Sequence, residues 1–218
     1  MHDPFDYFHV VFDWNGTVID DVGLALTSLN AIRIPLGLAD VTLEDYRHHF
    51  RFPIHDFYAD LGFDFARCNF SALVTEYLAQ FDARVGDCEL CPGVLSLVTA
   101  LHAQGTRISI LSASHQDTLH QTAQRNGIGT YIDHLFGLEN CDATGKLDRA
   151  RELDQQLERM PADRVLMIGD TDHDAQVARD RGWDFLAVAT GHQSADRLLA
   201  LGVPVSQTLA HCLPEHVD

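Results

Sequence analysis

Basic residues are scarce in this chain, and only one of them, Lys146, is a lysine. Lys and Arg number 15 against 32 Asp and Glu in 218 residues, which gives a formal net charge of −17 at pH 7. Nucleic acids and anionic membrane surfaces attract proteins through clustered Lys and Arg. We therefore expect neither a nucleic acid nor a membrane as a partner. A small anionic substrate would need a local cation to overcome the overall negative field.

Long apolar runs and zinc-type cysteine clusters are also missing. No apolar stretch reaches the ~18 residues of a membrane span, and the first residues have no basic flank before an apolar segment. We therefore expect a cytoplasmic protein without an anchor or signal peptide. Cys88 and Cys91 have C-x-x-C spacing, but no second Cys or His pair follows at the spacing of a zinc site. Free thiols are the expectation, with a redox or metal role as the alternative.

Short apolar segments that are typical of buried strands alternate with helical patterns along much of the chain. Five such segments cover residues 9–12, 107–111, 134–138, 165–168 and 185–189. Helices are predicted between them over residues 94–101, 147–160 and 174–181, and a capping box at Ser114 and Asp117 predicts another. Strands that alternate with helices favour right-handed crossovers. We therefore expect an α/β fold with a Rossmann-like, doubly wound parallel sheet.

Residues 20–87 break this alternation, because they contain no convincing strand. Apolar side chains recur at helical spacing over residues 22–32 and again over residues 70–81. Thr42 begins a capping sequence, and Pro53 is placed to start another short helix. This pattern predicts a helical cap domain that is inserted after the first strand.

The groups that suggest chemistry lie in the core domain, which in this interpretation comprises residues 1–19 and 88–218. They fall at the carboxyl ends of predicted strands or in the loops that follow: Asp13-Trp14-Asn15-Gly16-Thr17, Ser112-Ala113, Gly145-Lys146 and residues 169–174. Open α/β sheets bind their ligands at this edge. Asp13 and Asp170 would repel each other there without a cation, and a shared divalent ion with oxygen ligands fits Mg²⁺.

These four pieces, in this order and with an insert after the first, resemble the four motifs of the haloacid dehalogenase superfamily. The insert resembles that of the helical-cap subclass, which includes phosphoglycolate phosphatases. The resemblance implies that Asp13 is a nucleophile that forms an aspartyl-phosphate. It also implies that Mg²⁺ is held by the carboxylates of Asp13 and Asp170 and the backbone carbonyl of Asn15. Asp174 would support the metal and orient Lys146.

The same resemblance implies a set of residues that bind the phosphoryl group. Lys146 and the metal would neutralise phosphoryl oxygens as charge develops in the transition state. The other members of the set are Gly16, Thr17, Ser112 and Ala113. The resemblance therefore assigns both the nucleophile and the phosphate site to one edge of the sheet.

One residue departs from the family pattern. The second Asp of the D-x-D-G-T signature, which transfers protons to the leaving group and from water, is Asn15 here. An amide transfers neither proton, and general acid–base catalysis typically contributes ~10²–10⁴-fold to rate. Three compensations stay open: a leaving group that departs unprotonated, an acid from the cap, or transfer of the phosphoryl group to another acceptor.

The predicted cap offers several side chains that could serve as an acid or contact an anionic substrate. They are Arg47, His48, His49, Arg51, His55 and Tyr58. A solvated helix surface explains the same residues, so both interpretations stand at this point.

The sequence as a whole predicts a Mg²⁺-dependent phosphohydrolase that acts on a small phosphorylated metabolite. The alternative is a catalytically impaired or inactive member of the same superfamily that binds a phosphorylated ligand or a partner. A dehalogenase is disfavoured because Asp170 and Asp174 are both present, and a phosphomutase because it depends on the missing acid–base residue. The Schiff-base mechanism of phosphonoacetaldehyde hydrolases needs a cap lysine, which residues 20–87 lack.

Overall fold

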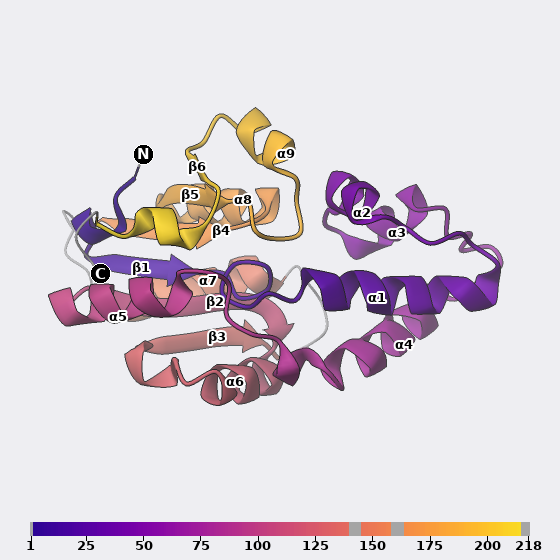
Figure 1. The fold of residues 1–218 in the computed structure, drawn as a ribbon, viewed down its shortest axis with the longest axis horizontal. Coiled ribbons are helices and arrows are strands. Elements are labelled where there is room, and N and C mark those ends of the chain that lie inside the picture. Colours follow the sequence, from indigo (N-terminus) through magenta and orange to yellow (C-terminus); the bar gives the residue numbers. More distant parts are fainter. Residues whose placement is uncertain (1, 140–144, 158–163, 215–218) are drawn as a thin grey trace.

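A computed structural model describes residues 2–139, 145–157 and 164–214. In this part of the chain, six strands form one parallel sheet in the order β3-β2-β1-β4-β5-β6 (Figure 1). The strands are β1 His9–Phe12, β2 Arg107–His115, β3 His134–Leu138, β4 Val165–Gly169, β5 Asp184–Val188 and β6 Val205–Ser206. The chain enters the sheet at its centre and β2 and β4 flank β1, so the loops after these three strands meet at one edge.

Helices cover both faces of the sheet. They are α5 Val94–Gln104, α6 Gln116–Arg125, α7 Gly145–Gln156, α8 Asp172–Arg181 and α9 Ala195–Ala200. Val10 and Phe12 of β1 belong to one hydrophobic cluster with buried residues of α5 and α6, whereas Val11 belongs to a second cluster with α7 and α8. Alternate side chains of a strand point to opposite faces, so β1 is buried on both sides. The predicted doubly wound α/β fold is confirmed.

Between β1 and α5 the chain forms four further helices, which lie at the carboxyl ends of the strands (Figure 1). They are α1 Val22–Arg33, α2 Leu43–His49, α3 Ile54–Asp60 and α4 Phe70–Asp82. Thr42 caps α2 by accepting a hydrogen bond from the backbone N–H of Asp45, and Pro53 precedes α3 as its N-cap. Short 3-10 helices cover Pro4–Asp6, Ile34–Leu36, Val85–Asp87, Gly129–Tyr131 and Leu209–Cys212. The expected helical insert is therefore present.

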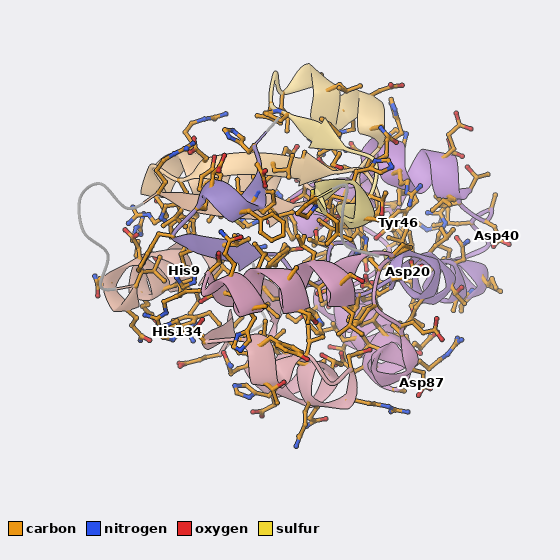
Figure 2. All side chains as sticks on the ribbon, turned by 60° about the vertical axis from the view of Figure 1, so that its left-hand side comes forward. His9, Asp20, Asp40, Tyr46, Asp87 and His134 are labelled. Atoms are coloured by element: carbon orange, nitrogen blue, oxygen red, sulfur yellow. The ribbon has the colours of Figure 1, made fainter. Side chains whose placement is uncertain are left out.

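The two ends of this helical segment lie side by side. The N–H of Asp20 donates to the carbonyl of Glu89 at 2.9 Å, and the N–H of Cys91 donates to the carbonyl of Val18 at 2.8 Å. The chain therefore leaves the sheet and returns to it through one paired connection. Figure 2 shows Tyr46 of α2 on the opposite side of the molecule from His9, which begins β1.

Several boundaries differ from those expected. The strand β2 continues to His115, so Ser114 lies in a strand and the predicted capping box at this residue is wrong; His115 caps α6 instead. The two-residue strand β6 had no signal in the sequence. The expected end of α7 near residue 160 lies outside the described residues, as does Cys141. Cys88 and Cys91 are free thiols.

Within the described ranges, every helix is too short or too polar to cross a bilayer.

Candidate active site

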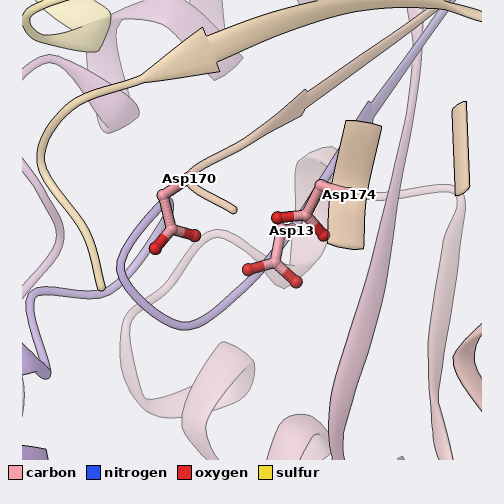
Figure 3. Close-up of side chains that lie close together, drawn as sticks. All are labelled: Asp13, Asp170 and Asp174. Atoms are coloured by element: carbon pink, nitrogen blue, oxygen red, sulfur yellow. The ribbon is translucent and has the colours of Figure 1, made fainter. Parts of the chain in front are cut away.

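Three aspartates meet at the edge where β1 and β4 end (Figure 3). Asp13 follows β1, Asp170 follows β4, and Asp174 lies in the first turn of α8. All three are buried, and one carboxylate oxygen of each lies within 4.8 Å of the others. The parallel pairing of β1 with β4 explains this meeting, because it brings the two strand ends into register.

Lys146 joins this cluster from the start of α7. Its Nζ donates to Asp13 Oδ1 and, at 2.7 Å, to Asp174 Oδ1, and the side chain is only 3% exposed. Burial would lower the pKa of Lys146, but the charges of Asp13 and Asp174 outweigh it and raise this pKa above its ordinary value. The lysine is therefore a fixed ammonium at the sheet edge, which is where the sequence predicted it.

The pKa values of the three carboxylates shift in different directions. Burial raises the pKa of Asp13 well above its ordinary value, against the opposing charge of Lys146. Burial also raises the pKa of Asp170, to about 6. For Asp174 the effect of burial is reversed by Lys146 and Thr171, which lower its pKa. Three buried carboxylates thus share one ammonium, and the unbalanced negative charge suits a divalent cation with oxygen ligands.

The side chain of Asn15 is held on both sides by hydrogen bonds. Its Oδ1 accepts from Ser114 Oγ at 2.6 Å and lies 3.5 Å from Ser112 Oγ, while its Nδ2 donates to Asp21 Oδ2 at 2.8 Å. The register of β2 against β3 shifts between Leu111 and His115, which is the stretch that carries both serines. Such irregularities re-aim side chains. The amide is therefore fixed in place.

Asp21 is a buried carboxylate with three partners. It accepts from the N–H of Gly16 at 2.7 Å and from Asn15, and its Oδ1 lies 3.5 Å from His192 Nε2. The other ring nitrogen of His192 is 2.9 Å from the hydroxyl of Tyr46 on α2. Burial would lower the pKa of His192, but Asp21 and the acids behind it raise this pKa to about 9. A positive charge on His192 therefore balances Asp21.

The loop after β5 packs tightly against Asp170. The N–H of His192 donates to Asp170 Oδ2 at 2.6 Å, and Thr17 Oγ1 donates to Asp170 Oδ1 at 2.9 Å. A Cβ on Gly191 would lie 2.0 Å from Asp170 Oδ2, so this position needs a glycine. Gly16 has φ +72°, and a Cβ there would meet the same oxygen at 2.7 Å. The two glycines let two backbone segments close around one carboxylate.

The predicted phosphate-binding residues occupy different environments. Ala113 and Lys146 line a cavity at the sheet edge, whereas Ser112 is fully buried and accepts from the N–H of Ser114 at 2.9 Å. The hydroxyl of Thr17 is bonded to Asp170, and the N–H of Gly16 is bonded to Asp21. The structure thus brings all of them to one edge, but it places only Ala113 and Lys146 on the cavity wall.

The six residues named as cap candidates also separate into two groups. His55 and Tyr58 line the cavity. Arg47 instead donates to the carbonyls of Thr190 and Gly191, at 2.8 and 2.9 Å. Arg51 lies 2.8 Å from Asp60 in an ion pair. These two arginines are engaged elsewhere.

The remaining two candidates, His48 and His49, lie on α2 away from the cavity wall. His48 is exposed, its ring packs edge-on against that of His49 at 5.0 Å, and its carbonyl accepts from Arg197 at 3.0 Å. We find no contact that directs either imidazole to the three aspartates.

The cavity extends from the aspartates into the helical segment and has a volume of about 550 Å³. Asp13, Asn15 and Asp170 lie at one end. Side chains of the helical segment line the rest, among them Leu29, Phe57, Tyr58, Phe70, Tyr77 and Phe81. A substrate held here would contact charged groups at one end and mainly aromatic or aliphatic groups elsewhere, with Asp82, His55 and His115 among the polar lining.

Sequence reasoning missed three members of the site, Asp21, Ser114 and His192. Asp21 could have been considered as the acid nearest the motif that contains Asn15. Ser114 was assigned to a helix cap because its sequence context also fits that role. His192 lies in a loop after β5 that carries no recognised pattern, so only the packing of this loop against Asp170 identifies it.

An α/β sheet with a helical insert after its first strand, and with acids and a lysine at its carboxyl edge, is the arrangement of a haloacid dehalogenase-like hydrolase. The family model described as "Haloacid dehalogenase-like hydrolase" matches residues 10–188. The chain belongs to this family.

Curated relatives carry two different names. The protein named tyrosine-protein kinase PtkA, from Mycobacterium tuberculosis, is 25% identical over 193 residues, which are 86% of this chain and 64% of that protein. The chain thus spans less than two thirds of the length of this relative. A protein named phosphoglycolate phosphatase, from Synechococcus elongatus, is 25% identical over 198 residues, 88% of each chain.

Solved structures share the fold. A haloacid dehalogenase-like family hydrolase from Streptococcus pneumoniae superposes with a TM-score of 0.80 at 20% identity, over 94% of this chain and 96% of that one. The structure of Mycobacterium tuberculosis PtkA superposes with a TM-score of 0.74 at 23% identity, over 87% of each chain.

Proposed function

We propose that this chain is a Mg²⁺-dependent phosphohydrolase that acts on a small phosphorylated metabolite through an aspartyl-phosphate on Asp13. The observation that carries the proposal is the ion-paired cluster of Lys146 with Asp13 and Asp174, beside Asp170 and at the end of a cavity. Membership of the hydrolase family and similarity to proteins named phosphoglycolate phosphatase support it.

The donor set fits a magnesium ion. Asp13 and Asp170 would hold it with carboxylate oxygens, together with the backbone carbonyl of Asn15, and Asp174 would support it while holding Lys146. When bound, Mg²⁺ would neutralise charge on the phosphoryl oxygens. Burial, together with the neighbouring acids, raises the pKa values of Asp13 and Asp170, and a cation held between these carboxylates would offset both effects.

The residues of the chain would divide the reaction between them. An oxygen of Asp13 would form a bond to phosphorus as the ester oxygen leaves with its electron pair, and water would then release phosphate from Asp13. Lys146 would neutralise phosphoryl charge, and its charge favours the ionised form of Asp13. The side chain of Asn15 is fixed by Ser114 and Asp21, so it would hold the backbone carbonyl of Asn15 in place beside the metal. It would not transfer a proton. Turnover should therefore depend strongly on how readily the leaving group departs unprotonated.

We also propose that residues 20–87 form a cap domain over a core of residues 1–19 and 88–218. The paired connection at Asp20 and Glu89 supports this division, because the chain enters and leaves the helical segment there. Arg47 and Tyr46 of α2 bond to the loop after β5, so the helical segment closes one side of the cavity.

A second candidate function is phosphoryl transfer from Asp13 to an acceptor other than water. The fixed amide of Asn15 favours it, because an amide at this position does not activate water for attack on the aspartyl-phosphate. Similarity to proteins named tyrosine-protein kinase PtkA is consistent with such a reaction. The two functions differ in whether phosphate or a phosphorylated acceptor accumulates when an acceptor alcohol is added.

A panel of phosphate esters, acyl phosphates and phosphoanhydrides, assayed with Mg²⁺ and with chelator, tests the main proposal. We expect phosphate release with Mg²⁺ and a steep fall in rate as the pKa of the leaving group rises. A flat dependence would contradict the role given to Asn15. Absence of turnover for every compound would favour the alternative, a protein that binds phosphorylated ligands without converting them.

A further inference from the structure

The basic groups that line the cavity among the described residues are Lys146 and three histidines, His55, His115 and His192. Each histidine lies beside an acid: His55 is 3.4 Å from Asp56, His115 is 4.0 Å from Asp117, and His192 is 3.5 Å from Asp21. Lys146 is the one Lys or Arg that lines the cavity among the described residues. It is already bonded to Asp13 and Asp174. In the helical segment, Arg47 is bonded to the backbone carbonyls of Thr190 and Gly191, and Arg51 is paired with Asp60. A second negative charge on a substrate would find no Lys or Arg partner on these described walls.

Negative charge, by contrast, is present along the wall. Asp21 and Asp82 both line the cavity in addition to the acids at the sheet edge. His192, which also lines it, is held by Asp21 and Tyr46. A carboxylate on the substrate would be desolvated among apolar groups, which is costly, and it would be repelled by Asp82. His192 balances the charge of Asp21 and is bonded to it, so it offers the carboxylate no free positive charge. This lining therefore favours an uncharged group on the substrate beyond the phosphoryl group.

The aromatic side chains of the apolar wall favour a ring. The rings of Tyr58 and Phe70 lie 5.9 Å apart at 73°, and those of Tyr77 and Phe81 lie 5.7 Å apart at 15°; all four line the cavity. Aromatic groups prefer such stacked and edge-on neighbours. A volume of about 550 Å³ is within the range of pockets that enclose ring-sized ligands.

The chemistry at Asn15 points to the same class of compound independently. The amide is fixed by Ser114 and Asp21 and supplies no proton to the leaving oxygen. A phenol has a pKa of about 10, whereas the pKa of a water O–H, which is comparable to that of an alcohol, is about 16. A phenolate therefore departs without protonation far more readily than an alkoxide.

We propose that the substrate is a phosphate monoester of an uncharged phenol, with the aromatic ring in the apolar part of the cavity. This inference rests on the proposed function, because it names the substrate class for the same site. In the step, the bond between Asp13 and phosphorus forms, and the bond between phosphorus and the phenolic oxygen breaks. The phenolate leaves with the electron pair and takes its proton from water.

A matched pair of substrates tests this directly. The two are 4-(carboxymethyl)phenyl phosphate and its carboxamide, which have similar size and phenols of similar acidity but differ in charge. We expect kcat/KM to be at least about tenfold higher for the carboxamide, and phosphoglycolate to be turned over more slowly than either. Equal values, or a preference for the carboxylate, would overturn the inference while leaving the proposed function intact.

A variant pair adds a test within the chain. Val74 lines the cavity from α4, whereas Ala79 is exposed on the same helix. Val74→Arg should bring the two kcat/KM values within about threefold of each other, and Ala79→Arg should leave their ratio unchanged. An unchanged ratio in both variants would contradict the placement of the ring.

Binding separates failure of the inference from failure of the proposed function. If no compound is turned over, calorimetry with the wild-type protein and Mg²⁺ would compare the benzylphosphonates that correspond to the two substrates. Tighter binding of the carboxamide, by at least about tenfold, would support the cavity assignment even without turnover. Equal binding, or tighter binding of the carboxylate, would refute it.

Discussion

Asn15 donates a hydrogen bond from its side-chain amide to the carboxylate of Asp21, at 2.8 Å. The D-x-D-G-T signature that this stretch resembles has an acid at the position of Asn15, and here the neighbouring buried acid is Asp21 instead. An aspartate at residue 15 would therefore face Asp21 across a hydrogen-bond distance. Two carboxylates that close do not both ionise readily.

The pairing predicts an unusual result for the substitution that restores the family motif. Asn15→Asp alone should gain less than tenfold in kcat/KM on alkyl phosphates and should lower the melting temperature. Asn15→Asp combined with Asp21→Asn keeps the hydrogen bond with donor and acceptor exchanged, so it should gain about 10²-fold, the contribution of a general acid. Rates and thermal melts of both variants check this. A double variant no faster than the wild type would contradict the account of Asn15.

Metal removal should affect stability as well as activity. A ligand that binds only the folded state stabilises it by about 2.7 kcal/mol at 100 times its Kd. Mg²⁺ should therefore raise the melting temperature of the wild type, and Asp170→Asn should abolish the rise.

The stabilisation by Mg²⁺ should also depend on pH. Burial raises the pKa of Asp170 to about 6 without metal, so protons compete with Mg²⁺ for this carboxylate increasingly as pH falls through 6. The rise should be smaller at pH 5.5 than at pH 7.5, and a rise that is independent of pH would contradict this ligand assignment.

The single lysine allows its burial to be measured chemically. Lys146 is 2% exposed and its ammonium is ion-paired, so it should resist amine-reactive reagents in the folded protein. We expect modification at least about 100-fold slower than after unfolding, because reaction requires local opening. The α-amino group serves as the internal reference. Modification of Lys146 at the same rate in folded and unfolded protein would show that it does not lie in the cluster.

The loss of folding stability in acid should arise partly from His9, which lies at the opposite end of the sheet from the three aspartates. His9 is fully buried, its Nε2 is 2.8 Å from Ser109 Oγ, and burial lowers its pKa to about 3. The unfolded chain, with an ordinary His pKa near 6.5, binds this proton first, so stability falls as pH drops below 6.5. The loss between pH 7 and pH 5 should be about 2 kcal/mol.

Two glutamine variants isolate this effect. His9→Gln should remove most of the pH-dependent loss in denaturant unfolding, whereas His120→Gln, at an exposed position, should retain it. Equal acid sensitivity of all three proteins would show that His9 is not the group responsible.

The parts of the fold that the sequence predicted correctly are those marked by a pattern of neighbouring residues, such as an apolar run. The apolar runs at β1 and β3 have the predicted bounds, because buried parallel strands are apolar throughout. The two-residue strand β6 is too short to leave such a signal. Ser114 was wrongly assigned because a serine three residues before an acid fits a helix cap, whereas its contact with Asn15 comes from a residue 99 positions away.

The candidate site shows the same division. The motifs placed Asp13, Lys146 and Asp170 at one edge because parallel strands end together. Their roles in catalysis remain predictions. The contact of His192 with Asp170 and the engagement of Arg47 by backbone carbonyls depend on how a loop folds back, which no local pattern encodes.

The most direct test of the whole account is phosphate release by Asp13→Asn against the wild type, with Mg²⁺ and an aryl phosphate. Asp40→Asn, which makes the same change at an exposed position, is the control. We predict a loss of at least about 10³-fold for Asp13→Asn, since the nucleophile is removed, and wild-type rates for Asp40→Asn. Activity of Asp13→Asn within tenfold of the wild type would contradict the assignment of Asp13 and the function built on it.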